Sequence, residues 1–415
     1  MNGALKQAGL LSGCGALCIA VRRAHTGVET AGPRSLRDYR PICPFPLYFV
    51  PGARHSRSVQ SLVRWLACVL LSGLAAHPAC AAFSSLYAFG DGVCTTTDNV
   101  SGPVSLYYGN RYCNGRIWIE VLAQRQGLAY DSTKNWSYFG HYSSNLVEHV
   151  SQFSAPADAN TSLFVVWVND ADFVDDMSKI YPSLDPAAWS NAITSSLANH
   201  LQALTNLYAK GARTLVMPTA ADITKTPQYS GLPVADKSFI RQRVIDFNAG
   251  FADMLNQARA TLPGVQIYVP DIFALLDELS AHPEDYGLVN PGIDALEDPN
   301  LADYSLDGPG ASYLFWDAFD PTAKAHAVIA GVVQQLISPV RISALTLLNG
   351  SNQLAVANIP IGLSGAVDGT SNLVSGTWTP VTNFDSLSAT QAIFAPAPGP
   401  WPFYRLRFPF AWSWP

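Results

Sequence analysis

The chain has 415 residues, of which 48% are hydrophobic and 13% charged, and its formal net charge is −6 at pH 7. This length is sufficient for one large core and a smaller second module. An acidic balance without a long basic run argues against nucleic acid as a partner, because phosphate binding needs clustered Lys and Arg. Low charge together with 17 Tyr, 19 Phe and 10 Trp is more typical of an exported globular protein than of a disordered chain.

The first 81 residues are predicted not to belong to the folded protein. Three arginines precede an apolar run over residues 65–76, and small residues follow it up to Ala81. This order is typical of a secretory signal peptide over residues 54–81, and the apolar run is short for a transmembrane helix. We interpret residues 1–53 as a doubtful N-terminal extension from a start site placed too early. The protein is therefore expected to be secreted, periplasmic or at the cell surface, with no transmembrane segment in its mature chain.

Of the seven cysteines, only Cys94 and Cys113 lie beyond the predicted signal peptide. In an oxidising compartment two cysteines most simply form one disulfide, and two buried free thiols are the alternative. The sequence contains no Cys/His spacing typical of a zinc site. We predict no metal and no other cofactor.

Residues 82–338 are predicted to form a layered α/β domain, because buried strands alternate with amphipathic helices. Four apolar runs are predicted as strands of a parallel sheet covered on both faces: 86–89, 163–168, 214–217 and 265–269. Four periodic segments are predicted as helices: 117–125, 187–210, 240–260 and 322–336. Gly211 stands where the long second helix needs a C-terminal cap.

Residues 339–415 are predicted to form a small β-rich module, since turn signals separate short apolar runs there. The turn signals are Asn349-Gly350, Asp368-Gly369 and Pro398-Gly399. Alternation of apolar residues with arginines predicts a strand over residues 403–408. The aromatic tail over residues 408–415 has two interpretations, a surface for sugar or a partner, or rings that pack onto the module.

The segment Leu86-Tyr87-Ala88-Phe89-Gly90-Asp91-Gly92-Val93 resembles the first block of the GDSL (SGNH) esterases and lipases. In that family a buried strand leads into a Gly-Asp-Ser-Leu turn that presents the catalytic serine. Further family landmarks follow in the same order at residues 110–118, 169–173, 207–213, 247–248, 271–273, 283–287 and 316–322. The resemblance implies a three-layer fold, a parallel sheet flanked by helices. It also implies an ancestral hydrolysis of esters in lipids or acylated glycans.

The family's mechanism needs a serine nucleophile, a histidine base with an orienting aspartate, and an oxyanion hole with an asparagine amide and a glycine N–H. By resemblance these positions fall on Gly92, Asp320, Asp317, Ala171 and Gly115. Only the orienting aspartate and the glycine are thus retained. A shifted register would instead bring Asn169 near the oxyanion hole.

The leading hypothesis is a degenerate esterase fold kept for binding an extracellular glycan or lipid, because the ordinary Ser-His mechanism lacks its groups. Loss of one oxyanion donor alone costs roughly 10²–10³ in rate. The alternative is an active ester hydrolase with a rewired site that uses His141, Cys94 or a pair of aspartates. A third hypothesis gives the role to the β module. We expect Cys94 and Cys113 to be joined as a disulfide between the nucleophile turn and the oxyanion loop rather than to supply a nucleophile.

Four residues are predicted to line a ligand pocket: Asp91, Asn169, Asp172 and His141. Together with Asp317 and Asp320 the aspartates make the predicted site acidic. If they converge, a hard cation such as Ca²⁺, a sugar hydroxyl or acid/base work on a glycoside fits them. The alternative is that each carboxylate caps a helix or is solvated.

Overall fold

The computed structural model describes residues 83–97, 104–290, 292–373, 377–396 and 403–408. The predicted signal peptide and N-terminal extension lie outside these residues. The Pro398-Gly399 turn and the aromatic tail after Phe408 also lie outside them. Among the described residues, no helix is both long and apolar enough to span a membrane.

A four-stranded parallel sheet forms the centre of the larger domain, in the order β1-β2-β3-β4. Its strands are β1 (Leu86–Gly90), β2 (Leu163–Trp167), β3 (Thr214–Val216) and β4 (Gln266–Tyr268). All residues of β1 and β2 are buried, as expected of parallel strands with helices on both faces. The four predicted strands are confirmed, each to within one residue at either end.

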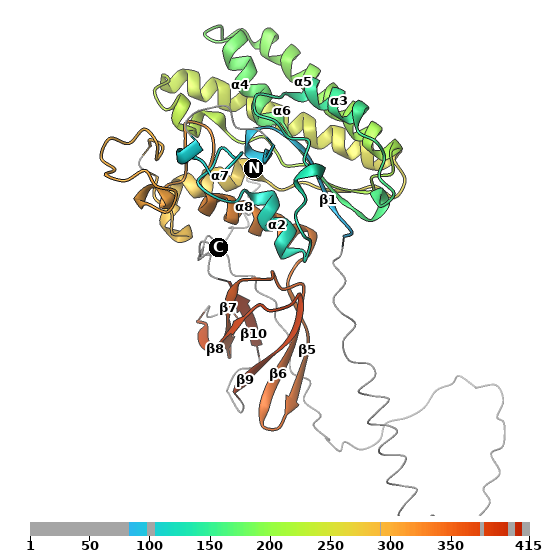
Figure 1. Ribbon diagram of the computed structural model, residues 1–415, viewed down its shortest axis with the longest axis vertical. Helices are drawn as coiled ribbons and strands as arrows, with labels where there is room; N and C mark the ends of the chain where they lie inside the picture. The colour runs from blue at the N-terminus through green and yellow to red at the C-terminus, as the bar shows by residue number, and fades with distance from the viewer. Residues whose placement is uncertain (1–82, 98–103, 291, 374–376, 397–402, 409–415) are drawn as a thin grey trace, which may run out of the picture. The chain divides into compact units, whose positions relative to one another are not determined.

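Helices cover both faces of this sheet, which makes three layers (Figure 1). Tyr87 and Phe89 enter the core on one face, and Leu86 and Ala88 enter the core on the other, because successive strand side chains point to opposite sides. The first core is completed by α3 (Ser143–Gln152), α4 (Asn169–Lys179), α5 (Pro186–Ala209) and α6 (Val234–Thr261). The second is completed by α2 (Trp118–Arg125), α7 (Ile272–Ala281) and α8 (Ala323–Ile337).

The predicted helices are confirmed as α2, α5, α6 and α8, although α6 begins at Val234 rather than at Ile240. Local sequence explains the ends of α5. The Asp185 carboxylate accepts a hydrogen bond from the Ala187 amide at the N-terminus. At the C-terminus Gly211 has a φ of +100°, which confirms the predicted cap. Three described helices were not predicted, namely α3, α4 and α7.

The C-terminal module contains two antiparallel three-stranded sheets, in the orders β5-β6-β9 and β10-β7-β8. Its strands are β5 (Arg341–Leu348), β6 (Ser351–Ala357), β7 (Ser364–Thr370), β8 (Thr379–Asp385), β9 (Thr390–Pro396) and β10 (Phe403–Arg407). The predicted Asn349-Gly350 turn is confirmed, since both residues have positive φ and join β5 to β6. The predicted turn at Asp368-Gly369 is wrong. Both residues lie inside β7, where the buried Asp368 carboxylate accepts hydrogen bonds from Arg405 and Arg407.

Candidate functional site

The turn after β1 is the part of the fold that would present a nucleophile. The Asp91 carboxylate accepts a hydrogen bond from the Val93 amide (3.1 Å) and so holds a single helical turn, Gly92–Cys94. This turn folds back tightly on the strand, because a Cβ added at Gly90 would lie 2.5 Å from Cys94 Cβ. Gly92 is buried in the turn and lines a cavity.

Asp320 lies directly opposite Gly92. A Cβ at Gly92 would lie 3.3 Å from Asp320 Oδ1 and 3.0 Å from the ring of Phe139. Gly92 does not have a positive φ, so the backbone itself accepts other residues there. The structure therefore brings together the two positions that resemblance assigns to the nucleophile and the base, as a glycine and a carboxyl group.

Asp317 shapes the loop that carries Asp320. Its Oδ1 accepts hydrogen bonds from the amides of Phe319 (3.0 Å) and Asp320 (2.8 Å), and its Oδ2 accepts one from the Tyr107 hydroxyl (3.0 Å). Burial raises the pKa of Asp317 to about 6 despite these donors. Its two oxygens thus hold the loop and Tyr107, and it does not line the cavity.

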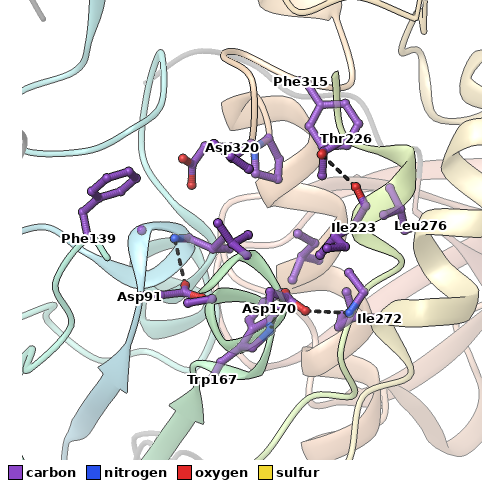
Figure 2. Close-up of a pocket in the computed structure, with 18 of the residues that line it drawn as sticks. Asp91, Phe139, Trp167, Asp170, Ile223, Thr226, Ile272, Leu276, Phe315 and Asp320 are labelled. Atoms are coloured by element: carbon purple, nitrogen blue, oxygen red, sulfur yellow. Dashed lines mark hydrogen bonds between the residues drawn. The ribbon is translucent and has the colours of Figure 1, made fainter. Parts of the chain in front are cut away.

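The Asp320 carboxyl group is 3% exposed and accepts no hydrogen bond from any described residue. Burial raises its pKa well above the ordinary value, and the neighbouring Asp317 and Asp91 raise it further. Figure 2 shows this carboxyl group pointing into the cavity opposite Phe139. Of the two carboxyl groups of this loop, that of Asp317 has donors among the described residues and that of Asp320 has none.

The cavity has a volume of about 340 Å³ and joins an acidic side to an apolar side. In Figure 2, Asp91, Phe139 and Asp320 lie on one side, and Ile223, Ile272 and Leu276 lie on the other. One face of α7 supplies much of the apolar wall through Ile272, Leu275, Leu276 and Leu279. Further apolar lining comes from Val174, Leu314, Phe315, Phe319, Ala325 and Ile329.

Two further carboxyl groups line the acidic side, of which Asp91 is buried and Asp170 half-buried. Asp170 accepts hydrogen bonds from the Ala221 amide (2.7 Å) and the Trp167 indole (2.9 Å), while burial raises its pKa to about 7. Burial also raises the pKa of Asp91 well above its usual range, and nearby Asp170 adds to the shift. Unlike Asp320, both groups have donors within the protein.

Of the two positions that resemblance assigns to the oxyanion hole, Ala171 and Gly115, only one lines the cavity. Ala171, in the first turn of α4, lines the cavity with Gly92 and Asp320. Gly115 is buried but is not part of the lining. Asn169 is also outside the lining, and its amide donates to the Pro218 carbonyl (2.9 Å). The shifted register therefore places no asparagine amide in this cavity.

Asp172 and His141, which the sequence predicted as lining residues, also lie outside the lining of this cavity. Asp172 faces the helices instead, where its carboxylate accepts hydrogen bonds from the Ser143 amide (2.8 Å) and the Ser196 hydroxyl. The His141 ring packs against Tyr138, with 5.1 Å between the ring centroids. Among the five aspartates considered, the cavity thus collects Asp91, Asp170 and Asp320 only.

The predicted Cys94–Cys113 disulfide is wrong, because both residues are buried free thiols. Each packs in the apolar core beneath the site, and the Cys113 thiol donates to Asn114 Oδ1 at 3.6 Å. Burial raises the pKa of both thiols well above the usual value. Since the thiolate is the reactive form, Cys94 is a poor nucleophile.

The described residues contain no group of three or more His, Cys, Asp and Glu side chains placed to hold a metal ion. The aspartates that line the cavity are thus not arranged as ligands of one cation. Sequence reasoning missed Phe139 and the apolar wall. Positions 272, 275, 276 and 279 follow the spacing of one helix face, and this signal would have found α7.

Comparison with solved structures gives distant similarities. LAE5, an alpha/beta hydrolase enzyme from the metagenome of Lake Arreo in Spain, is 12% identical, with a TM-score of 0.36 over 63% of this chain and 97% of its own. Axe2, an acetylxylan esterase from Geobacillus stearothermophilus, is 10% identical, with a TM-score of 0.35 over 61% of this chain and 94% of its own.

Sequence comparison gives closer relatives. Thermolabile hemolysin of Vibrio parahaemolyticus is 24% identical over 253 residues, which cover 55% of this chain and 56% of the relative. GDSL esterase/lipase 7 of Arabidopsis thaliana is 29% identical over 141 residues, which cover 31% of this chain and 38% of the relative. The matched region thus spans about half or less of these relatives. The family description GDSL-like Lipase/Acylhydrolase matches residues 86–333, more than half of the chain. The chain therefore belongs to the GDSL-like lipase/acylhydrolase family.

Proposed function

We propose that this protein is a secreted binding protein that holds a lipid-like ligand in the cavity of a GDSL hydrolase fold without hydrolysing it. The observation that carries the proposal is the pair Gly92 and Asp320. Gly92 has no hydroxyl group to attack an ester, and the position opposite carries a carboxyl group in place of an imidazole. The signal-peptide pattern over residues 54–81 supports secretion.

No other group of the cavity supplies the missing chemistry. Ser178, Thr226 and Tyr142 bring hydroxyl groups to the lining; those of Ser178 and Thr226 each donate to a backbone carbonyl three residues earlier, and no histidine is part of the lining. His326 in α8 is buried outside the lining, and burial lowers its pKa to about 3. A hydroxyl group without a base is a weak nucleophile. Compared with the family's catalytic site, this protein therefore keeps the cavity but not the catalytic groups.

The lining favours a hydrocarbon chain over a glycan. A sugar requires many hydrogen-bonding partners, whereas the wall beyond Asp170 is made mainly of aliphatic and aromatic side chains. Each buried CH₂ group contributes about 0.8 kcal/mol to binding. A chain of several carbons thus gains enough from this wall to bind without any chemistry.

Two measurements on the purified protein test the proposal. Short p-nitrophenyl esters are expected to show no turnover above the buffer rate, and a fluorescent probe with a hydrocarbon chain is expected to bind with saturation at one site. The triple variant Gly92→Ser, Ala171→Asn, Asp320→His is expected to gain measurable esterase activity, because it restores nucleophile, oxyanion amide and base together. The matched control, Gly92→Ala with the other two substitutions, is expected to stay inactive. Turnover by the unaltered protein would overturn the proposal.

One observation favours a second candidate function, ester hydrolysis by water. The space left at Gly92 lies within 3.3 Å of Asp320 Oδ1, measured from where a Cβ would stand. A water molecule there would have a carboxylate beside it, and a carboxyl group of raised pKa is a stronger general base than an ordinary one. Under this alternative the unaltered protein hydrolyses esters and Asp320→Asn abolishes the turnover.

A further inference from the structure

All ionisable groups with acidic or basic side chains in the cavity lining are acidic. The lining contains four aspartates, Asp91, Asp170, Asp175 and Asp320, and no Lys, Arg or His. Asp175 has its own partner, since its carboxylate forms an ion pair with Lys179 at 2.6 Å. Of the other three, Asp91 and Asp320 are buried and Asp170 is half-buried, and none has a cationic side chain paired with it among the described residues.

Asp320 differs from its two acidic neighbours in its hydrogen bonding. Asp91 accepts from Val93, and Asp170 accepts from Ala221 and Trp167, so their oxygens have donors inside the protein. The Asp320 carboxyl group has no donor among the described residues, although it is 3% exposed and points into the cavity. A buried polar group without a partner costs about 1–3 kcal/mol, and more if it is charged. Its free acceptors are therefore directed at whatever occupies the cavity.

The charged groups of the lining determine which charge the head group of the ligand can have. An anionic head group would lie beside an acidic lining that offers it no cationic side chain, and any ionised carboxylate there would repel it strongly where water is excluded. A protonated amine would donate to Asp320 and offset the charge of that carboxylate. The apolar wall of α7 lies on the other side of the same cavity and accommodates a chain.

We propose that the ligand of this cavity is a cationic amphiphile, an alkyl chain with a protonated amine head, whose ammonium group binds the Asp320 carboxylate. The inference rests on the proposed binding function and assigns the ligand's charge. The chain lies along Ile272, Leu276 and the other apolar residues, and the head lies against Asp320. A Cβ at Gly92 would already stand 3.0 Å from the Phe139 ring and 3.3 Å from Asp320 Oδ1, so the glycine keeps a side chain from crowding the carboxyl group.

Three probes with the same chain test this assignment: octylamine, 1-octanol and octanoate, titrated into the purified protein by calorimetry at pH 8. Octylamine is expected to bind about tenfold tighter than octanol, since a hydrogen bond between two charged groups is stronger than one from a neutral hydroxyl. Octanoate is expected to bind weakest. The Asp320→Asn variant is expected to lose this preference while its affinity for octanol stays the same. The control variant Asp246→Asn removes an equal charge from an exposed ion pair on α6 and is expected to keep the preference.

The outcomes separate the two proposals. Equal affinities of the unaltered protein for octylamine and octanol would overturn the charge assignment and leave lipid binding standing. Failure of all three probes to bind would overturn the binding function itself. Because the probe series on the unaltered protein decides by itself, the result does not depend on the folding of Asp320→Asn. A preference for octylamine that survives in a folded Asp320→Asn variant would also overturn the assignment.

Discussion

Asp320, the proposed binding partner of the ligand's head group, also lowers the stability of the folded state. Its carboxyl group is buried, has no donor among the described residues, and has a pKa well above the ordinary value because of burial and the adjacent Asp317. The unfolded chain ionises near pH 3.9. The folded protein therefore binds the proton more tightly, and its stability falls as the pH rises from about 4 toward the folded pKa. Asp170, with a pKa of about 7, acts in the same direction.

The Asp320→Asn variant is expected to be more stable than the unaltered protein at pH 8, by roughly 1 kcal/mol or more, because the raised pKa of Asp320 costs the folded state stability above the unfolded pKa and asparagine does not ionise. The gain should shrink as the pH is lowered and should vanish below about pH 3, where Asp320 is protonated in both states. Urea unfolding at pH 8 and pH 5 measures the difference. A variant that is less stable than the unaltered protein at pH 8 would contradict this account of the site.

The two buried thiols give a second residue-scale prediction. Protein processed after Ala81 is expected to show no reaction of Cys94 and Cys113 with a thiol reagent while folded, because both are fully buried with raised pKa values. Both should react after unfolding in the absence of reductant. If neither reacts after unfolding, a disulfide is present in solution. Mass measurement before and after alkylation provides the control.

At the scale of elements, the turn after β1 depends on glycine for a steric reason. A Cβ at Gly90 would lie 2.5 Å from Cys94 Cβ and 2.9 Å from its sulfur, which is closer than real atoms approach. The side chain opposing it is short and packed in the core, so it has little room to move. Any substitution at Gly90 must therefore displace the whole turn.

Gly90→Ala is expected to lower the free energy of unfolding by about 1–3 kcal/mol, since overpacking a close-packed core has that cost. Gly231→Ala is the matched control, because an added Cβ there meets nothing within 4 Å. Its stability should change by no more than about 0.5 kcal/mol. Equal effects of the two substitutions, measured by urea unfolding, would contradict the close approach at the turn.

Helix α7 provides the second prediction at this scale. Leu276→Ala is expected to weaken the binding of octylamine and octanol alike, by roughly tenfold, because it removes apolar contact with the chain and not with the head. This differs from Asp320→Asn, which should affect the amine alone. Ala274→Ser changes an exposed position of the same helix outside the lining and should leave both affinities unchanged. Calorimetry with the two probes distinguishes the patterns.

At the scale of the whole molecule, the sheet could be predicted from the sequence, whereas part of the site could not. Parallel strands buried on both faces are continuous apolar runs, so all four were recognised. Helix α4 was missed because its first turn reads Asn-Asp-Ala-Asp, which is typical of a loop. That omission explains why Asn169 and Asp172 were wrongly predicted to line the pocket. In a helix the three side chains of Asn169, Ala171 and Asp172 point in different directions, and of these only Ala171 lines the cavity.

The convergence of Gly92 with Asp320 followed from the order of the family landmarks, because the ends of parallel strands meet at one edge of the sheet. The direction of individual side chains did not follow from it. The disulfide prediction relied on the expected compartment and on the nearness of two loops. Neither consideration reveals that a thiol points into the apolar core, as Cys94 and Cys113 do.

The hydrogen bond between Tyr107 and Asp317 bears on the evolutionary history of the site. In an active relative an aspartate at this position orients the catalytic histidine, but here its oxygens already hold the Tyr107 hydroxyl and the loop amides. A histidine introduced at Asp320 would compete with Tyr107 for its partner. If the proposed loss of catalysis is correct, a single substitution at Asp320 would therefore restore no activity, and selection could not favour the return of the catalytic groups one at a time.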